Sequence, residues 1–238
     1  MDDVYSPEDH YCYANSAVLK NRLGLKTLSE LEQAERLFVN ARLIEMNGVP
    51  RTFDHTHFRA LHFHMFQDVY DWAGMERDVF IIKGQSPFAS PLHIRQHCIR
   101  ILSELRSELL AKRHDFGALP AILSRFVNEM NVVHAFREGN GRHLREFVRQ
   151  VLEELGCGFA AGVLQRERWI PAVIAGFKGD ESPMAALLEE AIITPATNRE
   201  KLFAPLSKEK RSHLCALLKR SGYPADIMRE YRATLRCE

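Results

Sequence analysis

Apolar residues recur at helical spacing along most of this chain. Within residues 28–44 they occupy positions 31, 34, 37, 38 and 41, and within residues 57–70 they occupy positions 58, 61, 65, 66 and 69. Steps of three and four residues place such side chains on one helix face, so both stretches are predicted to be amphipathic helices. Thr27 or Ser29 is the candidate N-cap of the first helix. The same reasoning predicts further helices at residues 91–110, 118–133, 142–155, 169–177, 183–193, 207–220 and 225–235.

One stretch departs from this spacing. Residues 77–88 contain the β-branched and aromatic run Val79–Ile82, followed by a turn with Gly84. Such a run before a glycine turn predicts a short hairpin, or at least an extended flap, with Val79–Ile82 as its exposed edge. The fold class predicted for the chain is therefore all-α with one short β-hairpin, and the strongly apolar helix 118–133 is expected to be central.

Composition limits the class of protein but does not identify a function. The 238 residues carry a net charge of +1, with 46% hydrophobic and 26% charged residues, which is typical of one globular domain with or without an appendage. This balance favours neither nucleic acid nor a membrane surface as a partner. No apolar run has the roughly 20 residues of a membrane span, and the acidic N-terminus does not resemble a secretory signal. A cytoplasmic protein with reduced thiols is the expectation for the five scattered cysteines, Cys12, Cys98, Cys157, Cys215 and Cys237.

The best candidate for a domain boundary is the polar, proline-containing stretch 194–198. It separates residues 1–195 from a basic helical extension at 196–238. No internal repeat or low-complexity tract interrupts either part.

The segment His134–Arg145 concentrates chemical groups in twelve residues, between two apolar helices. Glycines just before a helix let the backbone approach an anion closely, and the helix start supplies N–H groups and a positive dipole end. Arg142 and Arg145 are three apart and share a helix face, which suits a polyphosphate. Glu138 could hold Mg²⁺ against phosphate oxygens, and His134 could accept a proton from a hydroxyl. Each feature alone is more often a cap, a turn or a solvated charge; their joint occurrence favours a functional site.

The same segment resembles the Fic signature, His-x-Phe-x-(Asp/Glu)-Gly-Asn-Gly-Arg-x-x-Arg, and fills every fixed position. Its one departure is Ala135, where most members of that family carry proline. The resemblance extends to Tyr11–Gly24, to Leu61–His62 with Phe66–Gly74 and Arg77, and to Lys83–Gly84 and Phe88 of the flap (about residues 78–90). It therefore covers roughly residues 5–195. The resemblance implies the Fic fold, a helical bundle around a central helix–loop–helix whose active-site loop is 134–145.

The resemblance also implies an activity. It is the transfer of AMP from ATP onto a Tyr, Ser or Thr hydroxyl of a protein, with release of pyrophosphate. His134 is then the general base and Glu138 the Mg²⁺ ligand, while Phe136 anchors the loop by packing and Arg137 has no chemical role. Lysine stands at the place of Gly141 in relatives that transfer phosphate, so glycine favours AMP transfer. The positions assigned to nucleotide binding are Phe136, Gly139, Asn140, Gly141, Arg142, Arg145 and, on the flap, Lys83.

The family also implies partners and a mode of control. A target segment is expected to pair with the flap backbone. The internal inhibitory pattern Ser/Thr-x-x-x-Glu-(Gly/Asn) is matched only in part, by Thr234 and the terminal Glu238, so an antitoxin-like helical protein acting in trans is expected to restrain a toxin-like bacterial enzyme, with the N-terminal region as its docking surface. A C-terminal tail covering the site is one alternative for control. Delivery into a host cell is one alternative for location. The alternatives for activity are a Fic-fold enzyme that uses another donor, such as UTP, a phosphate donor or CDP-choline, and an inactive Fic-fold binding module.

Overall fold

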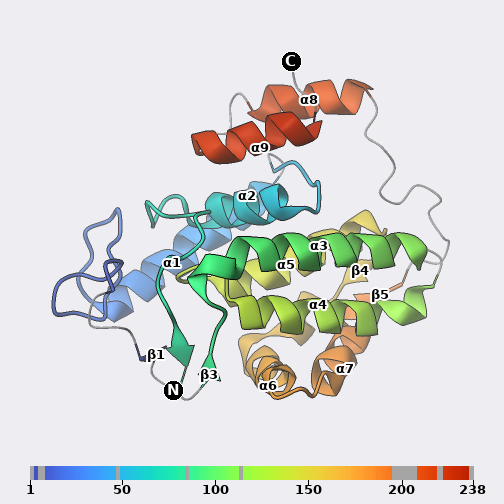
Figure 1. Cartoon of the computed structure of the whole chain (residues 1–238), viewed down its shortest axis with the longest axis horizontal. Coiled ribbons are helices and arrows are strands. Elements are labelled where there is room, and N and C mark those ends of the chain that lie inside the picture. Colours follow the sequence, from blue (N-terminus) through green and yellow to red (C-terminus); the bar gives the residue numbers. More distant parts are fainter. Residues whose placement is uncertain are drawn as a thin grey trace. The chain divides into compact units, whose positions relative to one another are not determined.

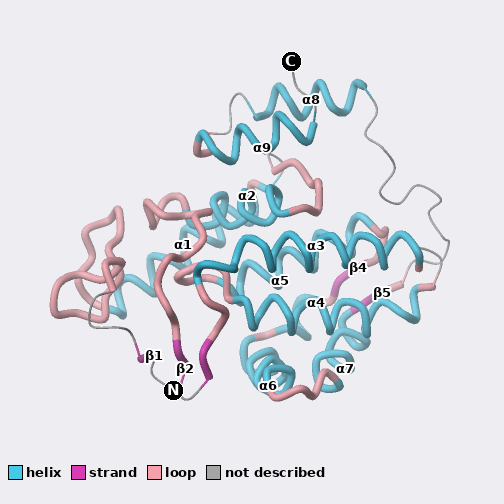
Figure 2. Tube along the Cα trace, in the orientation of Figure 1, coloured by secondary structure: helices cyan, strands magenta, loops and turns pink. Residues whose placement is uncertain are grey.

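The computed structural model describes residues 3–4, 9–46, 49–83, 86–112, 115–194, 208–218 and 222–235 (Figures 1 and 2). The chain forms two compact units, and each is interleaved in sequence with the other. Unit 1 contains residues 1–92, 136–139 and 206–238, and unit 2 contains residues 93–135 and 140–205. The predicted boundary near residue 195 lies outside the described residues. Figure 2 shows that the described parts are mostly helical, as the sequence predicts.

Unit 1 is built on α1 (Leu28–Ile44) and α2 (His55–Phe66). The Thr27 side chain caps α1 by accepting from the N–H of Glu30, so the first of the two predicted caps is confirmed. Asp54 caps α2 in the same way at the N–H of His57, 3.0 Å away. The prediction that this second helix continues to Tyr70 is wrong, because α2 ends at Phe66 and the chain then folds through turns up to Gly74.

The buried face of α1 differs from its apolar stripe. Leu31, Glu35 and Val39 are buried, and the Glu35 carboxylate accepts a hydrogen bond from the hydroxyl of buried Tyr70. Leu37 and Ile44 are instead exposed, with 66% and 84% of their surfaces accessible. The helical period is therefore confirmed. The face that packs inward is not the most apolar one, because it includes the Glu35 carboxylate with its hydrogen-bond donor Tyr70.

The flap is a three-stranded sheet within unit 1. Strand β2 (Ile82–Lys83) pairs antiparallel with β3 (Ser86–Pro87), with Ile82 opposite Pro87. Strand β1 (Asp3–Val4) pairs antiparallel with the other edge of β2, with Val4 opposite Ile82. The predicted hairpin is confirmed, but the strand begins at Ile82 rather than Val79.

Buried Arg77 holds the base of the flap. Its guanidinium donates to the carbonyls of Val79 (2.6 Å) and Ala89 (2.7 Å), one on each side of the hairpin. Burial lowers the pKa of Arg77 to about 10, so the side chain remains charged at neutral pH. A charged donor bonded to both arms fixes where the hairpin leaves the helical part of the unit.

Unit 2 is organised around α4 (Leu119–Val133), which contacts α3 (Ile94–Ala111), α5 (Asn140–Glu154), α6 (Arg166–Phe177) and α7 (Ser182–Ala191). The prediction that this apolar helix is central is confirmed for unit 2. After α7 the chain forms β5 (Ile192–Ile193), which pairs with β4 (Gly158–Phe159), so the predicted extension of that helix to Ile193 is wrong. The short 3-10 segments are η2 (Pro91–His93), η3 (Phe116–Ala118) and η4 (Ala161–Leu164).

The C-terminal helices α8 (Lys208–Leu218) and α9 (Ala225–Leu235) belong to unit 1, and α9 packs on α2. Ile227, Tyr231 and Leu235 of α9 are buried in one cluster with Ala60 of α2. Free thiols are confirmed for Cys12, Cys98 and Cys157, which are buried, whereas the prediction of a reduced thiol is wrong for Cys215, which is disulfide-bonded.

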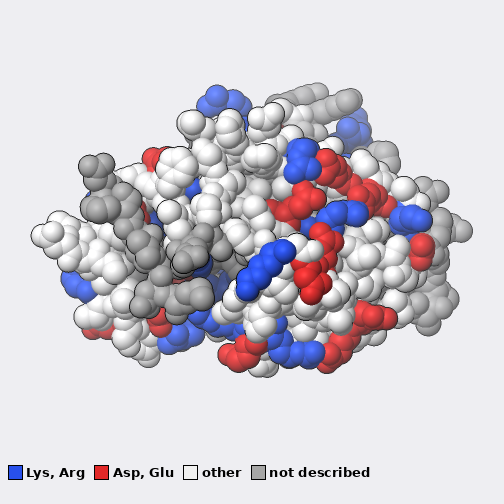
Figure 3. Space-filling view, turned by 60° about the horizontal axis from the view of Figure 1, so that its bottom comes forward, with Lys and Arg blue, Asp and Glu red and all other residues white. Residues whose placement is uncertain are grey.

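Charges of both signs are interleaved on the surface. Arg100 of α3 forms an ion pair with Glu104 one turn further along the same helix, and a second pair with Glu129, which links α3 to α4. On the face drawn in Figure 3, blue and red side chains lie side by side rather than in separate fields, in keeping with the net charge of +1. Among the described residues, no helix combines the length and the low polarity that spanning a bilayer requires.

Candidate active site

The predicted active-site segment passes from one unit to the other and back. His134 and Ala135 belong to unit 2, residues 136–139 to unit 1, and residues 140–145 again to unit 2. His134 ends α4 in a left-handed backbone conformation, with φ +48°, and its N–H donates to the carbonyl of Met130 at 3.0 Å. A non-glycine residue in this region costs on the order of 1–2 kcal/mol, so the surrounding structure imposes it.

In unit 1, Phe136 is completely buried on α2. Its ring stacks on His62 with 3.8 Å between centroids, and on Phe58 with 5.5 Å. An aromatic side chain enclosed in this way contributes several kcal/mol, because its truncation would leave a large cavity. The loop is therefore fixed to α2 at this residue.

Arg137 is a second anchor that sequence reasoning missed. The residue is 2% exposed, and its guanidinium lies 2.7 Å from the Asp9 carboxylate and 3.7 Å from the Cys12 sulfur. Removing one partner of a buried ion pair typically costs about 3–5 kcal/mol, because the other charge remains buried. No local signal in the sequence could reveal this pair, since 128 positions separate the two residues.

Glu138 and Gly139 share a peptide group that is held at both ends. The Glu138 carbonyl lies 3.0 Å from Nε2 of His62, while the Gly139 N–H donates to the Glu138 carboxylate at 2.9 Å. Gly139 has φ +82°, and a Cβ there would lie 2.2 Å from the Phe66 ring. Glycine is thus required at this position by both backbone conformation and space.

In unit 2, α5 begins at Asn140, two residues earlier than predicted, so Asn140 and Gly141 open its first turn. A Cβ on Gly141 would approach only Arg145 Nη1 and Trp169 Nε1, both at 3.9 Å. A Cβ there would make only ordinary van der Waals contacts, and the glycine lies beside a guanidinium at a helix N-terminus. Such a place can accept phosphate oxygens.

Arg145 lies in a cationic environment. Its guanidinium carbon is 5.5 Å from the ring centroid of buried Trp169. Burial, and then the like charges of Arg142 and Arg166, lower the pKa of Arg145, with Glu167 opposing them. Trp169 and Arg166 lie on α6 and were not predicted as site residues, because nothing in their own sequence context points to the loop.

The remaining predicted residues are Lys83 and the metal ligand. Lys83 lies on β2, with Asp3 and Ser86 as its register partners. Among the described residues, no three His, Cys, Asp or Glu side chains are arranged so that they could hold a metal ion. A divalent ion at Glu138 would thus take one protein carboxylate and complete its shell with phosphate oxygens and water. That ligand set fits Mg²⁺, and the half-buried Glu138 side chain fits the role.

The chain is similar to several known proteins. Residues 52–152 match the Fic/DOC family. A Sinorhizobium fredii protein named "Probable protein adenylyltransferase y4lH" is 36% identical over 187 residues, which cover 78% of this chain and 96% of that protein. The protein adenylyltransferase VbhT of Bartonella schoenbuchensis is 32% identical over 193 residues, covering 80% of this chain and 40% of that protein.

A solved structure shares the fold. It is the N-terminal Fic domain of a VirB-translocated Bep effector protein from Bartonella quintana, with bound ADP, and it aligns with a TM-score of 0.66 and 25% identity over 84% of this chain and 100% of that one. The chain belongs to the Fic/DOC family. Its relatives include proteins named as protein adenylyltransferases, and the predicted all-α fold with a small β flap is confirmed.

Proposed function

We propose that this chain is a protein adenylyltransferase, which moves AMP from ATP to a Tyr, Ser or Thr hydroxyl of a target protein. The observation that supports it best is the place of Gly141 in the first turn of α5, where a Cβ would lie 3.9 Å from the guanidinium of Arg145. In the reaction the hydroxyl oxygen bonds to the α-phosphorus, the bond from that phosphorus to the β-bridging oxygen breaks, and pyrophosphate leaves. His134 takes the hydroxyl proton, which is worth about 10²–10⁴ in rate.

The phosphate-binding roles follow from the charges in unit 2. Arg142 and Arg145 bind the β- and γ-phosphates, while Asn140 and the Gly141 backbone surround the anion. Their contribution is electrostatic, because charge builds on phosphate oxygens as pyrophosphate departs. Glu138 holds Mg²⁺, which when bound neutralises part of that charge.

The flap is the docking element for the target. An extended target segment adds to a strand edge through backbone hydrogen bonds, and alternate side chains then provide specificity. In this chain β1 already pairs with the edge of β2 that lies opposite β3. A target that uses this edge must therefore displace Asp3–Val4.

Control by a small antitoxin-like helical protein in trans remains our proposal. The exposed Leu37 and Ile44 of α1 offer it an apolar docking face. The only partial match to an internal inhibitory pattern ends at Glu238, which lies outside the described residues.

The experiment that tests the proposed function is incubation of the purified chain with labelled ATP, UTP or GTP in a cell lysate, followed by mass spectrometry of the labelled band. Label from the α-position of ATP should appear on a protein hydroxyl, and His134→Ala should abolish it while leaving ATP binding and unfolding temperature unchanged. If label from UTP or GTP is transferred instead, the group that this enzyme moves is that nucleotide and not AMP. Full labelling by His134→Ala would remove the mechanism, and no transfer by the native chain would favour a binding module.

A further inference from the structure

His62 lies between the active-site loop and the turn that follows α2. The side chain is completely buried, its Nδ1 accepts a hydrogen bond from the Gly74 N–H at 2.9 Å, and its Nε2 lies 3.0 Å from the Glu138 carbonyl. A ring that accepts at Nδ1 is neutral and carries its proton on Nε2. His62 therefore donates to the Glu138 carbonyl, and the Gly74 N–H fixes the tautomer that allows this.

The orientation of the ring is also fixed. Phe136 stacks on His62 with 3.8 Å between centroids and an interplanar angle of 19°, and Phe66 stacks with 4.6 Å and 25°. Rotation of the imidazole would break both hydrogen bonds and both ring contacts. The Nε2–H donor thus points to one place, which is the carbonyl of the Glu138–Gly139 peptide.

The Glu138–Gly139 peptide connects His62 to the Glu138 carboxylate. Its carbonyl faces His62, and its N–H donates to the Glu138 carboxylate at 2.9 Å. Because a peptide group is planar, fixing its carbonyl also fixes the direction of its N–H. His62 thereby holds the carboxylate of Glu138 through the peptide, although it does not touch that carboxylate itself.

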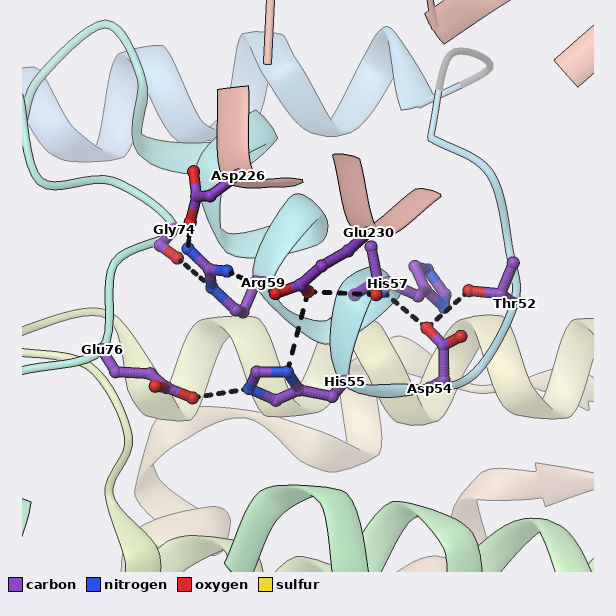
Figure 4. Close-up of polar contacts among 10 residues, drawn as sticks. Thr52, Asp54, His55, His57, Arg59, Gly74, Glu76, Asp226 and Glu230 are labelled. Carbon is purple, nitrogen blue, oxygen red and sulfur yellow. Dashed lines mark hydrogen bonds and ion pairs between the residues drawn. The ribbon is translucent and has the colours of Figure 1, made fainter. Parts of the chain in front are cut away.

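The turn at Gly74, which bonds to His62, is itself connected to the C-terminal helix α9 through Arg59. Arg59 donates through Nε to the Gly74 carbonyl at 2.9 Å, and its guanidinium forms ion pairs with Asp226 and Glu230 of α9 (Figure 4). Burial acts to raise the pKa of the Asp226 carboxyl, but the hydrogen bond and charge of Arg59, together with backbone hydrogen bonds, lower it on balance. At Gly74 itself a Cβ would lie 3.1 Å from Ile227 of α9.

We propose that His62 is a positioning residue, which orients the Glu138 carboxylate for its metal, and that α9 supports it through Arg59 and Gly74. The proposal rests on the proposed role of Glu138, because a carboxylate without a metal would need no such alignment. The alternative is that His62 is an ordinary buried histidine whose loss lowers stability alone. Partners that orient a metal ligand typically change metal affinity 10–100-fold when they are removed.

The test compares His62→Phe with His62→Gln. Phenylalanine keeps a flat ring between Phe136 and Phe66 but removes both hydrogen bonds, while glutamine keeps an N–H donor that can reach the Glu138 carbonyl. Binding of Mn²⁺ in the presence of ATP is followed by electron paramagnetic resonance, and ATP binding without metal by calorimetry. His62→Phe should weaken Mn²⁺ binding about 10–100-fold with ATP binding unchanged, and His62→Gln should restore part of it.

His64→Phe is the matched control. His64 is also a buried histidine of α2 whose Nε2 lies 2.9 Å from a backbone carbonyl, but that carbonyl belongs to Arg42 of α1. This variant should lose stability and keep native Mn²⁺ affinity. Equal loss of Mn²⁺ affinity in both variants, or none in His62→Phe, would overturn the proposal. Because metal binding is measured without a target protein, a failed transfer reaction would not affect this result.

The support from α9 is tested by the double variant Asp226→Asn with Glu230→Gln, which keeps size and removes charge. It should weaken Mn²⁺ binding less than His62→Phe does, and it should add nothing in the His62→Phe background. Independent effects of the two changes would show that α9 does not act through His62, and this part of the proposal would be withdrawn.

Discussion

Backbone conformation at single residues decides how the active-site segment is shaped. His134 and Gly139 both have positive φ, at +48° and +82°, and they enclose the four residues between them. The histidine adopts this conformation at a cost, since its Cβ is crowded there. Glycine adopts it freely, but at Gly139 it is also required by the Phe66 ring. The two positions therefore respond differently to substitution.

Three glycine-to-alanine variants separate the cost of backbone strain at positive φ from the cost of a steric clash. Gly162→Ala should be nearly neutral, because its Cβ would meet nothing and its φ is not positive, and Gly24→Ala should cost about 1 kcal/mol from backbone strain alone at φ +71°. Gly139→Ala adds a Cβ at 2.2 Å from Phe66 to the same strain, so it should cost about 1–3 kcal/mol more and lose transfer activity. Urea unfolding measures all three. A cost at Gly139 equal to that at Gly24 would mean that Phe66 moves freely.

At this scale the sequence predicted the residues of the motif but not those that hold it. His134 to Arg145 form one continuous segment, and the resemblance covers that segment position by position. Arg166 and Trp169 come from α6, and Asp9 from the N-terminal segment, so only the folded chain brings them to Arg145 and Arg137. Long-range pairs of this kind leave no local pattern.

Helices were predicted well because their apolar period is local. All the helices predicted from the spacing of apolar residues are present among the described residues, with ends displaced by a few residues. The two-residue strands β1, β4 and β5 were missed, because two residues are too few to show an alternating pattern. The buried face of α1 was also missed, because it depends on the buried pair of Glu35 with Tyr70.

Strand β1 gives a prediction at the scale of one element. A chain that begins at residue 9 lacks Asp3–Val4 and leaves the second edge of β2 open, while it keeps Asp9 for Arg137. Because a target no longer competes with β1 for backbone hydrogen bonds, KM for the target should fall and kcat should stay the same. Steady-state transfer of labelled AMP to the purified target measures both constants. If KM rises on truncation, β1 forms part of the docking surface instead of blocking it.

At the scale of the whole molecule, the C-terminal helices belong to the same unit as residues 136–139 of the active-site loop. Residues 206–238 group with residues 136–139 in unit 1, and Ile227, Tyr231 and Leu235 of α9 are at most 1% exposed. Each such side chain contributes about 1.5–3 kcal/mol by burial. The Tyr231 hydroxyl also donates to the Pro50 carbonyl at 3.0 Å. The tail is therefore part of the core of unit 1.

Deletion of residues 200–238 should for this reason lower both the unfolding temperature and AMP transfer. The deletion exposes Val49 and Ala60, which pack on the deleted part of the cluster, and removes both acidic partners of Arg59, so the turn at Gly74 loses its support. Tyr231→Ala should lower the unfolding temperature and AMP transfer in the same direction but by less, because Tyr231 is buried. Arg232→Ala, at an exposed neighbouring position, is the neutral control. Calorimetry and labelled-ATP transfer are measured on the same preparations. Strongly raised transfer by a folded truncated chain would identify the tail as an internal brake, and restraint by a partner in trans would then be unnecessary.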